Sequence, residues 1–129
     1  MAGNLPEYVY RALRNDENPD EGLVAENPNA CVSAEDFIAY GSRLSTQFIA
    51  TTASYHVAYH KFGHNGCRTI VKIDVKIAIA CGLRCYDFRF GDGLSSCRAI
   101  NFATSSDEIL FEGGRIPSFA LTVVHRPSI

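Results

Sequence analysis

Three places in this sequence put a chemically useful side chain inside a segment that otherwise has the character of a β-strand. Arg11 lies in the first segment, Thr51 and Thr52 end the second, and Glu108 opens the third. An arginine that points inward needs a carboxylate partner or an anionic ligand, and a fixed carboxylate can stabilise positive charge that develops in a transition state. Each residue alone is equally typical of a solvated strand edge. Their use therefore depends on whether the fold brings them together.

Short β-branched and aromatic runs, bounded by turn residues, predict the strands that carry these side chains. Gly113-Gly114 and Pro117 form a turn that closes the strand opened by Glu108. A further apolar run at residues 77–81 fits either a short helix or an extended segment, and residues 86–90 are ambiguous. The predicted strands are residues 8–13, 47–52, 69–75, 109–111 and 118–125.

Two helices are predicted between these strands. Ser33, followed by two acidic residues, predicts a helix that buries aromatic and aliphatic residues up to Tyr40 and ends at Gly41. A second helix begins near Ser54. We expect irregular segments at residues 15–29 and 99–107, the latter with Phe102 at its apolar centre.

The spacing of three histidines gives the best candidate for a metal site. His56, His60 and His64 recur at four-residue steps, so the first two share one face of the predicted helix. Gly63 ends that helix before the third histidine, and no carboxylate lies at a matching step, so we predict no metal site. The cysteines are odd in number, and we expect Cys81 and Cys85 to be small core residues.

The length and the order of the predicted elements indicate one α+β domain that spans residues 1–129. Apolar residues make up 47% and charged residues 20% of the chain, with a net charge of −2, which is typical of a globular protein and argues against a partner that is duplex nucleic acid. The chain has no membrane-spanning run, and its first residues lack the features of a signal peptide. We therefore expect a monomer, in the cytoplasm or elsewhere inside a cell, that does not bind membranes; a secreted effector stays open as an alternative.

Taken together, the three places resemble the arginine, serine-threonine-serine and glutamate motifs of the ADP-ribosyltransferases, in the branch that includes cholera toxin and pierisin. The resemblance implies a split antiparallel β-sheet core with a few flanking helices. It also implies that NAD⁺ binds as a substrate in the cleft between the two halves of the sheet. The matching segments, in chain order, are Tyr10-Arg11-Ala12, Ala50-Thr51-Thr52 and Glu108-Ile109 followed by Gly113-Gly114.

The resemblance also implies a role for each matching residue. Arg11 corresponds to the arginine that contacts the phosphate and ribose region of NAD⁺. Thr51 and Thr52 correspond to residues that support the cleft and orient the catalytic glutamate by hydrogen bonds. Glu108 corresponds to that glutamate, which stabilises the oxocarbenium-like transition state as nicotinamide leaves. Ala12 would also contact NAD⁺.

Aromatic residues after the second motif are candidates to stack on nicotinamide. Tyr55 and Tyr59 occupy suitable places, although both are equally plausible as core residues.

Two residues depart from the family pattern. Ala50 stands where the family has a serine, so one hydroxyl that would contact NAD⁺ is missing. Ser106 stands two residues before the catalytic glutamate, where relatives that modify arginine have glutamate and others have glutamine. Because serine cannot act as a general base for an arginine, we expect another acceptor, bound by the loop that contains Phe102 and Ser106.

Three hypotheses follow from these motifs. The chain is an active ADP-ribosyltransferase or NAD⁺ hydrolase, whose acceptor is an unidentified protein, nucleotide or nucleic acid. Alternatively, it is a degenerate member of the same fold that binds NAD⁺, another nucleotide or a protein partner without catalysis. The third hypothesis is an unrelated α+β interaction module, in which Arg11 and Glu108 lie far apart.

Overall fold

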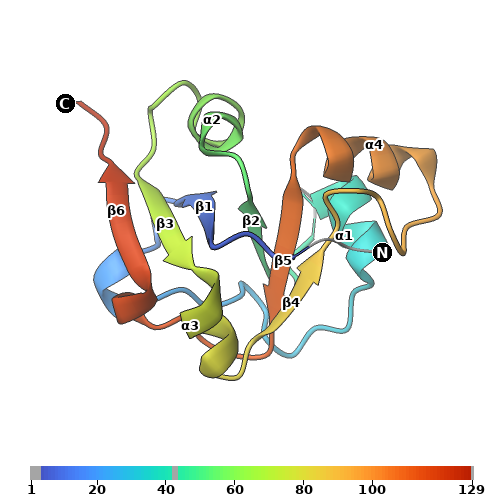
Figure 1. Cartoon of the computed structure of the whole chain (residues 1–129), viewed down its shortest axis with the longest axis horizontal. Helices are drawn as coiled ribbons and strands as arrows, with labels where there is room; N and C mark the ends of the chain where they lie inside the picture. Colours follow the sequence, from blue (N-terminus) through green and yellow to red (C-terminus); the bar gives the residue numbers. More distant parts are fainter. Residues whose placement is uncertain (1–3, 42–43, 129) are drawn as a thin grey trace.

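The computed structural model describes residues 4–41 and 44–128. Residues 1–3, which belong to the segment without signal-peptide features, lie outside the described residues. Six strands form one antiparallel sheet in the order β4-β5-β2-β1-β3-β6 (Figure 1). The strands are β1 (Tyr8–Ala12), β2 (Phe48–Thr52), β3 (Ile70–Asp74), β4 (Arg84–Asp87), β5 (Glu108–Glu112) and β6 (Leu121–His125).

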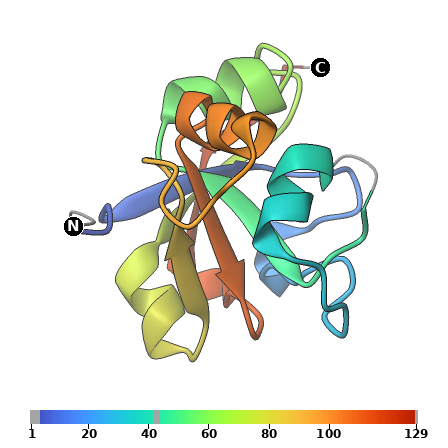
Figure 2. The same ribbon diagram turned by 90° about the vertical axis from the view of Figure 1, so that its right-hand side faces the viewer.

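Short helices flank this sheet at three places (Figures 1 and 2). The α-helices are α1 (Ala34–Tyr40), α2 (Tyr55–Val57), α3 (Val75–Ala80) and α4 (Cys97–Ser105). A π-helix, η3 (Ala58–Phe62), continues α2, and two 3₁₀ turns occupy η1 (Pro19–Glu21) and η4 (Ser118–Ala120). Within the described part of the chain, none of these helices has the length and apolar character needed to cross a membrane.

The sheet consists of two halves that meet at one point. The register pairs all of β1 with β3, and all of β2 with β5. Between β1 and β2, however, the register holds only the pair Tyr10↔Thr52. The halves β4-β5-β2 and β1-β3-β6 are therefore joined at this pair, and backbone groups on either side of it face a split.

Strand β5 is buried on both faces because each face packs on a different core. Ile109 and Phe111 belong to the larger core, which includes residues of β1, β3 and α3. Leu110 points the other way, into a second core formed with α1 and α4, which lie side by side at one end of the sheet (Figure 2). This explains why the sequence of β5 is a continuous apolar run rather than an alternating one.

The structure confirms the α+β class and the mainly antiparallel sheet, but corrects one predicted loop. Residues 97–105 form helix α4, with Ser96 at its N-cap, where the hydroxyl accepts a hydrogen bond from the Ala99 amide at 3.1 Å. Ala99 and Ala103 are completely buried. Because these small residues lie four positions apart, the helix can approach the sheet closely. The polar residues around them led to the prediction of a loop at 99–107.

Several other predictions also change. The strand predicted to run to residue 75 ends at Asp74, whose side chain caps α3, so the ambiguous run at 77–81 is helical. Tyr40 is 47% exposed and Cys81 is exposed, so neither belongs to the core. The last strand begins at residue 121, after a turn in which Phe119 is 71% exposed.

The cap of α4 can be tested by mutation. Ser96→Ala removes the hydroxyl that satisfies a free backbone amide, so we expect a loss of about 1 kcal/mol in the free energy of unfolding. Urea unfolding followed by circular dichroism measures this. The control is Ser105→Ala at the other end of the helix, where the hydroxyl only donates back to the Phe102 carbonyl. Equal stability of wild type and Ser96→Ala would contradict the helix start.

Candidate active site

One cavity of about 1110 Å³ brings most of the predicted site residues together. It opens beside the split in the sheet, and its wall is formed by β1, β2, the start of β5, and the facing sides of α1 and α4. The sequence-predicted residues that line it are Arg11, Ala12, Ala50, Thr51, Thr52, Phe102 and Glu108. Tyr55, Tyr59 and Ser106 do not line it.

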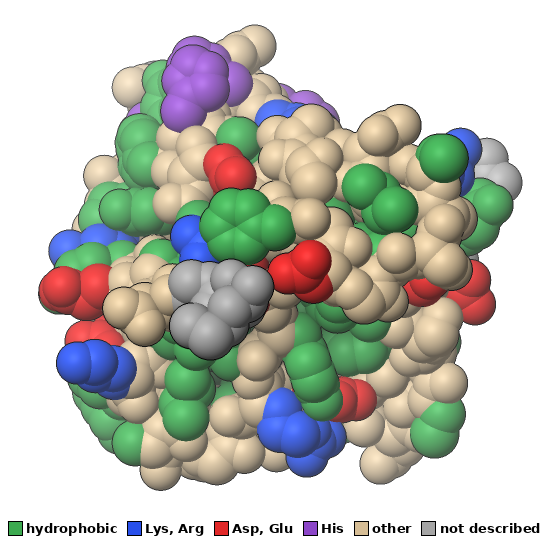
Figure 3. All heavy atoms as spheres, turned by 45° about the vertical axis from the view of Figure 1, so that its right-hand side comes forward, with side chains coloured by type: hydrophobic (Ala, Val, Ile, Leu, Met, Phe, Trp, Pro, Cys, Tyr) green, Lys and Arg blue, Asp and Glu red, His purple; other side chains and the backbone are tan. Residues whose placement is uncertain are grey.

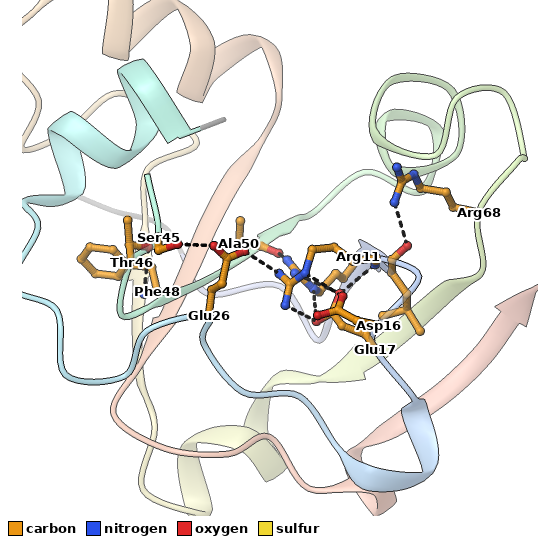
Figure 4. A network of polar contacts seen from close by, with 11 residues as sticks. Arg11, Asp16, Glu17, Glu26, Ser45, Thr46, Phe48, Ala50 and Arg68 are labelled. Atoms are coloured by element: carbon orange, nitrogen blue, oxygen red, sulfur yellow. Dashed lines mark hydrogen bonds and ion pairs between the residues drawn. The ribbon is translucent and has the colours of Figure 1, made fainter. Parts of the chain in front are cut away.

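Arg11 spans the split between the two halves of the sheet (Figure 4). Its Nη1 donates a hydrogen bond to the Ala50 carbonyl of β2 at 2.7 Å. Its Nε and Nη2 donate to the two carboxylate oxygens of Glu17 at 3.2 and 3.1 Å. The side chains of Arg11 and Glu17 are only 11% and 7% exposed. Arg11 is thus held in one orientation by a partner on each side.

The threonine pair fixes the backbone on either side of Glu108. Thr51 donates from Oγ1 to the Ile109 carbonyl, and Thr52 donates from Oγ1 to the Ser106 carbonyl, both at 2.7 Å. Both hydroxyl protons are therefore used on backbone carbonyls. The resemblance had implied that the two threonines orient Glu108 by hydrogen bonds. They do so only through the backbone on either side of Glu108 and do not hydrogen bond to its carboxylate.

Glu108 is a buried carboxyl group at the cavity wall. It is 3% exposed and lies opposite Thr52 in the register of β2 and β5. Among the described residues, no side chain or backbone amide donates a hydrogen bond to its carboxylate. Burial raises the pKa of Glu108 to about 8, while the charges of Lys61 and Arg11 act in the opposite direction. Without a ligand, this group holds its proton at neutral pH.

Lys61 lies beside the site without lining the cavity, and the sequence did not reveal it. It extends from η3, and its ammonium group donates a hydrogen bond to the Ser106 hydroxyl at 2.6 Å. The Nζ atom also lies 4.3 Å from the centre of the Phe102 ring. Nothing in the local sequence distinguishes it from a surface lysine, because only the contact between η3 and α4 places it near Glu108.

Ser106 and the two candidate tyrosines do not line the cavity. Ser106 is completely buried behind the start of β5. Tyr55 is 38% exposed and packs edge-on against Tyr10, with the ring centres 5.6 Å apart. Tyr59 packs against His125, with the ring centres 4.9 Å apart. Tyr10 is the tyrosine that lines the cavity.

The histidines gather over α2 and η3, at the top of the view in Figure 3. The rings of His56 and His60 are 4.4 Å apart. His64 has left the helix, with a φ of 49°, and lines the cavity instead. Within residues 4–41 and 44–128, no three His, Cys, Asp or Glu side chains are grouped so that they could hold a metal ion.

The fold and the site thus define an α+β protein with a split antiparallel sheet and a cavity beside the split that is lined by both charged and apolar side chains. A solved structure named EcPltA is similar to this chain, with a TM-score of 0.55 and 15% sequence identity over 92% of this chain and 74% of that chain. At this identity the similarity shows a related fold. No family model matches the sequence, and a search of curated proteins found no match.

The clamp formed by Arg11 can be tested through stability. Arg11→Ala removes the two-pronged partner of the buried Glu17 carboxylate, which keeps only its contacts with Arg14, and the partner of the Ala50 carbonyl. We therefore expect a loss of roughly 3 kcal/mol in the free energy of unfolding. The control is Arg84→Ala, since Arg84 forms an ion pair with Glu112 but is 60% exposed, and such pairs contribute little. Urea unfolding of both variants measures the difference. Equal losses would show that Arg11 does not hold the two halves together.

The burial of Glu108 predicts a particular dependence of stability on pH. The pKa is about 8 in the folded protein, against an ordinary value of 4.5. Between these values the folded state binds more protons than the unfolded state, so the free energy of unfolding falls as the pH rises, by up to about 1.4 kcal/mol per unit. Glu108→Gln removes this slope, so the variant should gain stability relative to wild type between pH 5 and pH 8.5.

A control for this experiment lies at the other end of the same strand. Burial also acts to raise the pKa of Glu112, but hydrogen bonds from Tyr86 and Arg84 outweigh it and hold the pKa below its ordinary value. Glu112→Gln should therefore lose stability relative to wild type at neutral pH, a difference that disappears in acid. If the free energy of unfolding depended on pH in the same way in wild type and Glu108→Gln, the raised pKa of Glu108 would be contradicted.

Proposed function

We propose that this chain is an NAD⁺-dependent mono-ADP-ribosyltransferase, or an NAD⁺ glycohydrolase if water is the acceptor. The observation that supports this most is that Arg11 and Glu108, the outer members of the three-motif pattern, line the same cavity beside a split antiparallel sheet. The third hypothesis, an unrelated module, required these two residues to lie far apart, so we set it aside.

The proposed reaction breaks the bond between nicotinamide and ribose. Nicotinamide carries a positive charge in NAD⁺ and leaves as a neutral molecule, so positive charge moves onto the ribose in the transition state. The carboxylate of Glu108 complements that charge more than it complements the ground state. A bound cationic nicotinamide group also favours loss of the Glu108 proton. NAD⁺ thus promotes the ionised form of the residue that acts on it.

Arg11 is proposed to bind the phosphate groups of NAD⁺. Three of its N–H groups are used on Glu17 and Ala50, and a guanidinium group has five. Two N–H groups of Arg11 are therefore left for an anionic ligand. Arg68 and Arg98 also line the cavity and add positive charge to it. Arg14 lines it as well, but is paired with acidic residues that include Glu26 of the same wall.

A second candidate is a protein that binds NAD⁺, a related nucleotide or a protein partner without catalysis. The observation that favours it is the pairing of Arg11 with Glu17, whose negative charge competes with that of a phosphate group. The missing hydroxyl at Ala50 acts in the same direction, by about 1 kcal/mol of binding free energy.

Release of nicotinamide from NAD⁺ separates these candidates. We expect purified protein at pH 8.5 to release nicotinamide, measured by chromatography, and Glu108→Gln to reduce the rate by about 10²-fold or more. Glu112→Gln is the control, because it makes the same chemical change on the same strand outside the cavity. A Glu108→Gln variant that keeps most of its turnover would refute the proposed mechanism. A raised melting temperature with NAD⁺ but no release would favour the binding protein.

A further inference from the structure

We infer that Lys61 forms an acceptor subsite beside Glu108, and that the acceptor of ADP-ribose is a carboxylate, carried by an acidic residue of a protein. This inference rests on the proposed function. It concerns the second substrate, which neither Arg11 nor Glu108 selects.

The position of Lys61 is defined by three contacts beside the cavity, although Lys61 itself does not line it. Its Nζ atom donates to the Ser106 hydroxyl at 2.6 Å and lies 4.3 Å and 5.6 Å from the ring centres of Phe102 and Phe62. Both phenylalanines line the cavity. The ammonium group is therefore held where η3 meets the end of α4, behind two phenylalanines of the cavity wall and near enough for its charge to act on Glu108.

Lys61 also differs from Arg11 in how its charge is balanced. Arg11 has an ion-pair partner in Glu17, whereas Lys61 forms no ion pair with any carboxylate of the described residues. Its hydrogen bond partner, Ser106, is neutral. A free positive charge beside a reactive carboxyl group is suited to attract a second anion and to offset its repulsion by Glu108.

Among the described residues, the charged groups that act on Glu108 itself include no second carboxylate that could take a proton from a neutral acceptor, and the other titratable lining residues, Glu26 and His64, come from other segments of the chain. Ser106 is buried and bonded to Lys61, and the charged groups that act on Glu108 are both cations. An arginine, serine or amide acceptor loses a proton when it reacts, and therefore needs a base. A carboxylate is already an anion and needs none.

The transfer step with a carboxylate is balanced without a further reagent. A carboxylate oxygen donates an electron pair to C1′ of the ribose and forms an ester bond. The bond between C1′ and the nicotinamide nitrogen breaks, and its electron pair neutralises the charge of the leaving nicotinamide. No proton moves, and no oxidant or reductant is required.

Charge favours an acidic protein residue over a phosphate group on nucleic acid. The chain has a net charge of −2, whereas proteins that track a nucleic-acid backbone have a concentrated basic face. A single ammonium group is a compact point charge that suits one carboxylate, while bidentate phosphate recognition is more typical of arginine.

The test compares three peptides of equal length as acceptors. One contains glutamate, the second contains glutamine at the same positions, and the third contains phosphoserine. Wild-type protein is incubated with NAD⁺ at pH 9. Nicotinamide release and peptide-bound ADP-ribose are measured separately, by chromatography and mass spectrometry. We expect transfer to the glutamate peptide only, through a bond that neutral hydroxylamine cleaves because it is an ester.

Variants of Lys61 then test the subsite itself. In Lys61→Met we expect the ratio of transfer to nicotinamide release to fall at least about tenfold, the effect of losing about 1.4 kcal/mol of acceptor binding. Lys61→Arg should restore most of this ratio because it keeps the charge. Lys76→Met, an exposed lysine on α3, is the matched control and should behave as wild type.

Each other outcome has a defined meaning. Transfer to the glutamine or phosphoserine peptide in preference to glutamate overturns the carboxylate acceptor. A Lys61→Met variant with an unchanged ratio overturns the role of Lys61. Nicotinamide release without transfer to any peptide overturns this inference and leaves the glycohydrolase. If the wild type releases no nicotinamide, the proposed function fails, and the inference fails with it.

Discussion

The split in the sheet, and the arginine that spans it, is the constraint on which the rest of this structure depends. Strands β1 and β2 are paired at Tyr10↔Thr52, and beyond that pair the Ala50 carbonyl is satisfied by Arg11. A buried backbone carbonyl without a partner is costly, and so is a buried arginine without a carboxylate. Arg11, Ala50 and Glu17 satisfy one another. The split can therefore persist as a cavity rather than close into a continuous sheet.

In this arrangement the two ionisable residues of the site differ in how their charge is balanced. Arg11 is paired and bridges the two halves, whereas Glu108 lies on a strand that is buried on both faces. Burial of that strand stabilises the fold through its apolar residues, but it destabilises the ionised form of Glu108. The position of the carboxyl group is set by the backbone, through Thr51 and Thr52. Its pKa is set by burial, against which the charges of Lys61 and Arg11 act.

Helix α4 and the π-helix η3 lie around the side of the cavity on which Glu108 is found. Helix α4 packs on β5 through Ala99 and Ala103, and Phe102 lines the cavity from its other side. The π-helix η3 places Lys61 against α4, where it contacts both Phe102 and Ser106.

The sequence by itself determined the α+β class of the fold and every strand of the sheet except β4, whose region was left ambiguous. Local patterns carry that information, because the alternation of apolar residues and the turn at Gly113-Gly114 act over a few positions. The order of the motifs also placed Arg11 and Glu108 in one site. Only the tertiary structure decided that Glu17 pairs with Arg11, that the threonine hydroxyls bind backbone, and that residues 97–105 form a helix. It alone showed that Lys61 of η3 contacts Ser106 at the end of α4, although the two residues lie 45 positions apart in the chain. Contacts between residues so far apart depend on how whole elements pack, which no local pattern encodes.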